Sequence, residues 1–152
     1  MKELHYTDTI QYELEQTARL MRKLALQLFD NLKMELSVDE CVVLDTLSCN
    51  PNICQRDLSK LILKDRANTG RIIISLEEKE LIERNVDTKN NRLVKKLNIS
   101  QKGKELLQQI SCKIKSYMEN VTTTISHEEV SKVRDILKVF RLNLEKVVEI
   151  NI

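Results

Sequence analysis

Polar side chains that can form directional hydrogen bonds gather in residues 65–75, a segment expected to be helical. An Asn amide can pair with adenine through two hydrogen bonds, an Arg guanidinium can pair likewise with guanine, and a Thr methyl can touch the thymine methyl. Asn68, Thr69 and Arg71 supply these three groups within four residues. Arg66 and Ser75 fall largely on the same outer side of the expected helix. The segment therefore predicts a surface that contacts base edges or nearby phosphates, the alternative being an ordinary solvated helix face.

A second polar cluster lies in residues 89–95, where a strand is expected to return after a turn. We expect Arg92 to enter a minor groove, because arginine senses the narrow groove of A·T-rich tracts. A surface charge at a strand end is the alternative interpretation. Asn91 belongs to the same predicted wing. Candidates for phosphate contacts, which position a protein on a duplex without specifying its sequence, are Gln55, Arg56, Lys60, Lys89 and Lys95.

Charge is distributed unevenly along the 152 residues, although the net charge of the whole chain is only +2. Residues 54–102 contain 12 lysines and arginines against 7 aspartates and glutamates, a net charge of +5, and the remainder carries −3. The positive charge thus coincides with the polar segments described above. Such segregation favours a surface for a polyanion, since phosphate neutralisation provides most of the affinity for a duplex.

The elements that would position these residues form a helix-turn-helix followed by a β-hairpin wing. A first helix is expected to carry Leu58, Leu61 and Ile62 on one face, and residues 63–64 make the turn. Asp65 caps the second helix, which directs Ile72, Ile73 and Leu76 to the core. Residues 81–82 begin the first wing strand, 87–91 form a polar turn, and 93–97 return. In this arrangement the second helix fits the major groove of DNA.

Helices are also expected on both sides of this domain, which gives a mainly α fold with a small β-wing. Apolar residues at helical spacing fill residues 9–32, and Ser37 with Glu40 forms a capping box for a helix that ends before Asn50 and Pro51. Ser100 and Ser126 cap two further helices. We expect residues 36–103 to form the DNA-binding domain, and residues 1–35 and 104–152 a dimerisation region. The terminal helices have too few neighbours in one chain to bury their apolar stripes, which predicts a homodimer and a palindromic binding site.

Several classes of protein are disfavoured by the sequence. It contains no glycine-rich phosphate loop, nucleophile elbow or HExxH motif, so an enzyme is not expected. His5 and His127 are isolated, and neither a metal nor a cofactor is expected. No apolar run approaches the roughly 20 residues that span a bilayer, and the N-terminus lacks the apolar region of a signal peptide, so we expect a cytoplasmic protein.

Two alternatives within this interpretation stay open. Cys41, Cys49, Cys54 and Cys112 are expected to be reduced structural thiols, but Cys49 and Cys54 are close enough in sequence for a redox-sensing role. The chain could also be a helical interaction module that has lost DNA binding. Retention of the basic and amide groups on the second helix argues against that module.

The sequence resembles the MarR family of bacterial regulators. The resemblance is carried by QRDLSKL at 55–61, KDRANTGRI at 64–72 and LEEKELIER at 76–84, and by NNR at 90–92 with LNISQKG at 97–103. It extends over the whole chain in the order of helices. It implies a homodimeric repressor that competes with polymerase at a palindromic operator and is relieved by a small, often phenolic or amphipathic effector. Tyr6 and Tyr12 could line an effector pocket or simply pack between subunits.

Three positions depart from the family pattern. Glu80 stands where glycine is common, so either a left-handed turn there costs a little more or the turn differs. Asn90 replaces an aspartate that orients the wing arginine, so Arg92 is expected to be held more loosely. Gly70 is a mid-helix glycine that costs about 1 kcal/mol relative to alanine, and close approach to DNA or drift would explain it equally.

Overall fold

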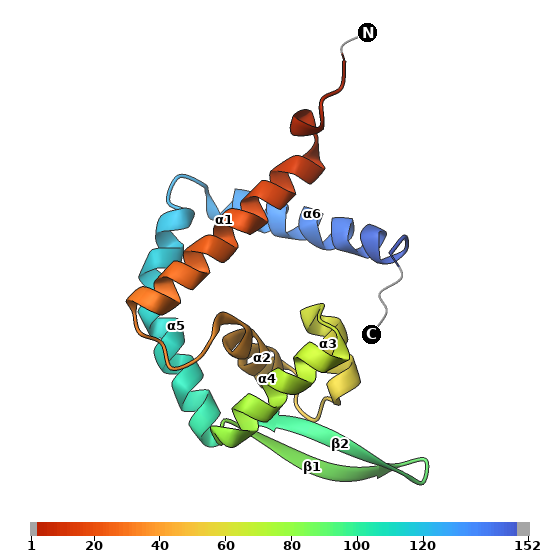
Figure 1. Cartoon of the computed structure of the whole chain (residues 1–152). Helices are drawn as coiled ribbons and strands as arrows, with labels where there is room; N and C mark the ends of the chain where they lie inside the picture. The colour runs from red at the N-terminus through yellow and green to blue at the C-terminus, as the bar shows by residue number, and fades with distance from the viewer. Residues whose placement is uncertain (1–2, 149–152) are drawn as a thin grey trace. The chain divides into compact units, whose positions relative to one another are not determined.

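The structure is a computed structural model that describes residues 3–148, without the side chain of Lys89. Helices account for most of these residues. These residues belong to two compact units, Met1–Cys41 and Val42–Ile152. In chain order the elements are η1 (Tyr6–Asp8), α1 (Ile10–Asn31), α2 (Val38–Cys49), α3 (Gln55–Ile62), α4 (Arg66–Glu78), β1 (Ile82–Lys89), β2 (Arg92–Ile99), α5 (Gln101–Val121) and α6 (His127–Glu145) (Figure 1). The mainly helical fold with one two-stranded antiparallel sheet confirms the predicted winged helix-turn-helix. In the part of the chain that is described, no helix is long and apolar enough to cross a membrane.

Side-chain caps begin the helices at the positions that the sequence predicts. The Ser37 hydroxyl accepts a hydrogen bond from the Glu40 amide (3.1 Å), and the Glu40 carboxylate accepts one from the Ser37 amide (2.8 Å). Ser126 and Glu129 form the same reciprocal box at the start of α6. Each cap satisfies amide groups that the first helical turn leaves without partners, and losing one costs about 1 kcal/mol.

The turn between α3 and α4 is held by backbone geometry. Leu63 ends α3 in the left-handed region (φ 54°), and the Leu63 and Lys64 amides donate to carbonyls of the last turn of α3. Of the apolar residues predicted on one face of this helix, Leu58 is fully buried whereas Leu61 is 55% exposed. Ser59 is buried instead, and its hydroxyl donates to the Gln55 carbonyl (2.9 Å), so its polar group has a partner.

The wing is longer and its turn is shorter than the sequence predicts. β1 and β2 pair through eight positions, from Ile82 with Ile99 to Lys89 with Arg92. Asn90 and Asn91 alone make the turn, with φ values of 53° and 60°. Positive φ at both central residues is the requirement of a type I′ hairpin turn, which asparagine tolerates. Residues 87–89, expected in the turn, therefore continue β1.

The root of the wing is joined to the segment that precedes α3. The Leu97 amide donates to the Ile53 carbonyl (2.8 Å), which forms an isolated antiparallel bridge. Beside it, the Asn98 side chain accepts from the Asn52 amide (2.8 Å) and donates to the Asn52 side chain (2.9 Å). The core of this region consists of fully buried or nearly fully buried side chains from several elements, Val43, Leu44, Leu47, Leu58, Ile73, Leu76, Leu81 and Leu97.

A second junction connects α4, the wing and α5. Glu80 adopts the left-handed conformation (φ 61°) between α4 and β1, which is the first of the two alternatives left open by the sequence. Such a conformation costs a non-glycine residue roughly 1–2 kcal/mol. The Ser100 hydroxyl donates to the Glu80 carbonyl (2.8 Å), and the Ser100 amide donates to the Leu81 carbonyl (2.9 Å). Gly103 is buried in the first turn of α5, and a Cβ there would lie 2.8 Å from Ile99 Cγ1 and against the Leu81 carbonyl oxygen.

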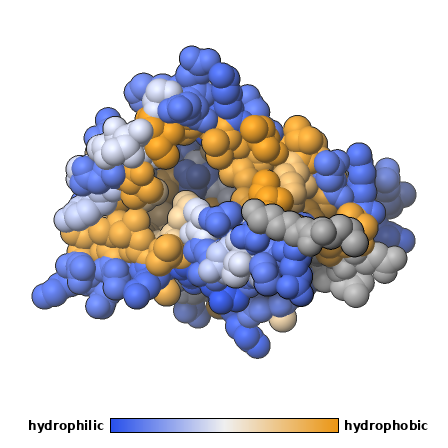
Figure 2. All heavy atoms as spheres, turned by 90° about the horizontal axis from the view of Figure 1, so that it is seen from above, coloured by the Kyte–Doolittle hydropathy of each residue, from blue (hydrophilic) through white to orange (hydrophobic). Residues whose placement is uncertain are grey.

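The terminal helices leave much of their apolar surface uncovered. α6 has no buried residue among those described, and Val133, Ile136, Val139 and Leu142 on it are all more than half exposed. α1 buries Leu28 while Leu20 and other apolar residues stay exposed. Figure 2 shows hydrophobic side chains gathered into continuous patches on one face of the molecule. Patches of this kind mark surfaces that bind another molecule.

Candidate nucleic-acid interface

Helix α4 presents a polar surface from its first two turns. Arg66, Asn68 and Arg71 are exposed, and Ser75 is half-buried. The prediction that Thr69 faces bases is wrong for this structure, since Thr69 is 0% exposed. Its hydroxyl donates to the Asp65 carbonyl one turn earlier (2.8 Å), which satisfies the polar atom and lets the methyl group pack in the core.

Asp65 organises the N-terminus of α4. One carboxylate oxygen accepts from the Asn68 amide nitrogen of the backbone (2.7 Å), and the other accepts from Asn68 Nδ2 (2.6 Å). The backbone hydrogen bond from Asn68 is the main reason that the pKa of Asp65 lies below its ordinary value, with smaller contributions from the Asn68 side chain and the charge of Arg71. Arg71 Nη1 in turn donates to Asn68 Oδ1 (3.4 Å). The sequence identified these residues individually but not this connection between them.

Gly70 allows the side chain of Gln55 to cross from α3 to α4. Gln55 Nε2 donates to the Arg66 carbonyl (3.3 Å), and it lies 3.2 Å from the position that a Cβ on Gly70 would occupy. The glycine therefore makes room for a contact between the two helices. Because this neighbour is the end of a flexible side chain, the contact does not by itself require a glycine.

The wing displays its polar residues near the tip. Asn91, Arg92 and Lys95 are exposed, whereas the side chain of Lys89 lies outside the described part of the structure. The strand register pairs Lys89 with Arg92 immediately before and after the turn. Two apolar residues that sequence reasoning did not single out, Val86 and Leu93, are also exposed on the wing.

The remaining candidate phosphate contacts lie at the start and end of α3. Arg56 and Lys60 are exposed, whereas Gln55 is half-buried by its contact with α4. All of these residues belong to unit Val42–Ile152, as do α4 and the wing. The second unit thus carries every residue that the sequence proposed for DNA contact.

Other chemistry has little support in the described part of the chain. No group of three or more His, Cys, Asp or Glu residues there is arranged to hold a metal ion. The four cysteines are free thiols, Cys49 and Cys112 exposed and Cys41 and Cys54 half-buried. Tyr6 contacts Tyr12 edge to face and donates to Glu15 (2.8 Å), a hydrogen bond that raises the pKa of Tyr6. These tyrosines therefore contact each other and Glu15 within their own unit.

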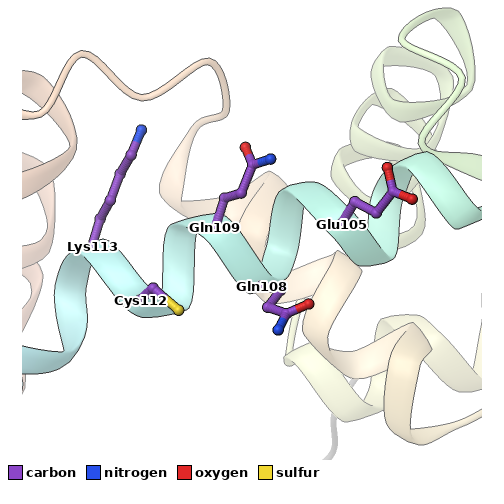
Figure 3. Close-up of a pocket in the computed structure, with 5 residues that line it drawn as sticks. All are labelled: Glu105, Gln108, Gln109, Cys112 and Lys113. Carbon is purple, nitrogen blue, oxygen red and sulfur yellow. The ribbon is translucent and has the colours of Figure 1, made fainter.

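A hollow of about 560 Å³ lies along α5. Glu105, Gln109 and Lys113 point to one side of the helix, and Gln108 and Cys112 point to another (Figure 3). The lining combines an ammonium group, a carboxylate, two amides and a thiol. All five lining residues belong to α5, so the hollow is an open groove along one helix.

Comparison with known proteins identifies chains with the same architecture. Residues 36–94 match the MarR family. The transcriptional regulator SlyA is similar in structure, with 27% sequence identity, a TM-score of 0.74, and coverage of 90% of this chain and 94% of that one.

Two more distant structures share the fold. MepR of S. aureus, solved as a complex with DNA, is 19% identical with a TM-score of 0.73, covering 93% of this chain and all of that one. PcaV of Streptomyces coelicolor, solved with its natural ligand, is 16% identical with a TM-score of 0.71, covering 95% of this chain and all of that one. No curated protein sequence matches the chain significantly.

Proposed function

We propose that this chain is a homodimeric, sequence-specific DNA-binding repressor of the MarR type, whose palindromic operator is released when a small molecule binds. The match of residues 36–94 to the MarR family and the structural similarity to SlyA support this proposal. Helix α4 would lie in the major groove and Arg92 in the adjacent minor groove. The observation that carries the proposal is the surface of α4. It exposes Arg66, Asn68 and Arg71 beside a basic wing, on a helix whose opposite face is buried through Ile73 and Leu76.

The wing supports DNA binding through its charge arrangement. The strand register places the backbone positions of Lys89 and Arg92 opposite each other on either side of the turn, so two basic residues belong to the tip of the wing. Arg92, the first residue of β2, is exposed and belongs to the residue type that inserts into narrow minor grooves. The segment 54–102 adds its net charge of +5 to the electrostatic attraction.

The dimer is supported by the uncovered apolar surfaces of the terminal helices. α6 extends over 19 residues without burying one of them in the single chain. A hollow of about 360 Å³ on this helix is lined by Ile136, Val139 and Phe140 with two polar neighbours. A second copy would cover these side chains, and two-fold symmetry would place two α4 helices one DNA turn apart.

The hollow along α5 is our candidate for the effector site. Lys113 and the Gln109 amide, which point to the same side of α5, would bind a carboxylate or phenolate. PcaV was solved with its natural ligand, which provides a precedent for ligand binding in this fold. An effector would act by changing the spacing of the two α4 helices, since a shift of a few Å removes their register with successive major grooves.

Two arginine variants test the proposed interface. An operator selected from a library of random duplexes would be titrated with wild-type protein, Arg71→Ala and Arg92→Ala, and with Arg134→Ala as a matched control because Arg134 is exposed on α6. We expect Arg71→Ala and Arg92→Ala each to weaken binding by about 10-fold or more while the protein stays dimeric, and Arg134→Ala to bind normally. Equal affinities for all four proteins would refute the assignment of this surface. Loss of the dimer in the first two variants would show that they are structural residues.

A further inference from the structure

The contacts at the start of α4 give Asn68 a different role from that of a base reader. We infer that Asn68 is a positioning residue, held by Asp65 so that its carbonyl oxygen directs the guanidinium of Arg71 toward a guanine. The inference rests on the proposed function and specifies which side chain of α4 reads the operator. It also gives Asp65 a function in recognition beyond capping the helix.

The first step is the hydrogen-bonding capacity of the Asn68 amide. To pair with adenine through two bonds, an asparagine must offer both its carbonyl oxygen and one N–H to the base. In the structure Nδ2 donates to Asp65 Oδ2 (2.6 Å), and Oδ1 accepts from Arg71 Nη1 (3.4 Å). One N–H and one lone pair of the amide remain unused, but the orientation of the amide is set by Asp65 and its oxygen is directed at Arg71.

The second step is the strength of the bond that fixes the amide. Asp65 accepts from the backbone and the side chain of the same residue, Asn68, so rotation of the side chain would break one bond to a carboxylate. Hydrogen bonds to ionised groups are roughly twice as strong as those between neutral groups. The same two bonds lower the pKa of Asp65, because both stabilise the ionised carboxylate.

The third step concerns what remains available on Arg71. A guanidinium has five N–H donors, and Asn68 uses one of them. The others suffice for a bidentate pair with guanine O6 and N7. The guanidinium is joined to the backbone by a long side chain with several rotatable bonds. An acceptor beside it therefore restricts the directions in which it can point. The chain Asp65–Asn68–Arg71 thus sets the geometry of one reader.

The test compares sequence preference rather than affinity. Wild-type protein is titrated against the selected operator and against duplexes in which each base pair is replaced in turn. The guanine read by Arg71 is the position whose preference disappears in Arg71→Ala. We expect Asn68→Ala to lower the preference at this same position by about 10-fold, to leave preferences at other positions unchanged, and to cause no further loss in the Arg71→Ala background.

A second variant separates positioning from base reading. The double variant Asp65→Asn/Asn68→Asp keeps a helix cap, an amide–carboxylate hydrogen bond and an acceptor facing Arg71, but it removes the amide that adenine requires. We expect it to retain the wild-type guanine preference. Because the relocated carboxylate would weaken binding to all duplexes alike, the readout is the ratio of affinities for the guanine operator and its substituted form.

Three outcomes would overturn the inference. Loss of an adenine preference at another position in Asn68→Ala, additive with Arg71→Ala, would make Asn68 a base reader. Uniform loss over all duplexes without a change in ratios would give Asn68 a merely structural role. Loss of the guanine preference in the double variant would show that an acceptor beside Arg71 is insufficient. A wild-type protein without any sequence preference would instead refute the proposed function itself.

Discussion

Replacing Gly103 by alanine should destabilise the protein by inserting one methyl group at the junction of α4, the wing and α5. Gly103 is buried in the first turn of α5. Its added Cβ would press against the Leu81 carbonyl oxygen and lie 2.8 Å from Ile99 Cγ1 and 3.2 Å from the Leu81 carbonyl carbon. The Leu81 carbonyl cannot move freely, because it accepts a hydrogen bond from the Ser100 amide (2.9 Å).

The magnitude follows from two opposing effects. Overpacking of a filled core costs about 1–3 kcal/mol, and obstruction by backbone places this site at the upper end of that range. Alanine gains up to about 1 kcal/mol over glycine in a helix. We therefore expect a net loss of about 2 kcal/mol in the free energy of unfolding. With a urea m-value of about 2 kcal/mol/M, the unfolding midpoint falls by about 1 M.

Gly70→Ala is the matched control, because the same change is made in another helix. There the neighbour is Gln55 Nε2 at 3.2 Å, the end of a flexible side chain that can move by a few tenths of an ångström. The midpoint of this variant should be unchanged or higher. Urea unfolding followed by circular dichroism, at one fixed protein concentration because dimerisation contributes to stability, measures both. Equal midpoints for the two variants would refute the packing argument.

Three further predictions concern titration, assembly and oxidation. Folding lowers the pKa of Asp65, so the ionised carboxylate stabilises the folded protein at pH values above the unfolded pKa. This stabilisation is lost as the pH falls through the lower folded pKa. Below about pH 4, the free energy of unfolding should therefore depend less on pH in Asp65→Asn than in the wild type. Ile136→Glu, at a residue 59% exposed on α6, should convert a dimer to a folded monomer in analytical ultracentrifugation, whereas the neighbouring Ser131→Glu should stay dimeric; a dimeric Ile136→Glu would place the interface elsewhere. If Cys49 and Cys54 are ordinary thiols, mild peroxide should leave operator affinity unchanged; a reversible loss that is absent from the Cys49→Ser/Cys54→Ser variant would favour the redox alternative.

Local signals made much of the fold predictable from the sequence. Each helix cap, at Ser37, Asp65, Ser100 and Ser126, involves two residues three positions apart. The helix starts can therefore be recognised in the sequence without knowledge of tertiary contacts. The hairpin was also predicted, but its turn was placed too broadly. The pair Asn90–Asn91 satisfies the type I′ requirement by itself, and extended strands then follow on both sides.

The errors arose where long-range packing or a side-chain hydrogen bond decided the outcome. Thr69 is polar enough to suggest a base contact, yet its hydroxyl is satisfied within the helix and its methyl group fills the core. Leu61 fits an apolar stripe but is exposed in the single chain, while Ser59 is buried in its place. The contact between Asn68 and Asp65 depends on side-chain rotamers, which residue spacing does not determine.

The central claim, sequence-specific recognition of DNA, is tested most directly by a fluorescence-anisotropy titration. The duplex upstream of the protein's own gene would be compared with a scrambled duplex of the same composition at several salt concentrations. We predict tighter binding to the upstream duplex, with affinity falling steeply as salt rises because phosphate contacts release counterions. Absence of binding to either duplex at low salt would contradict the account.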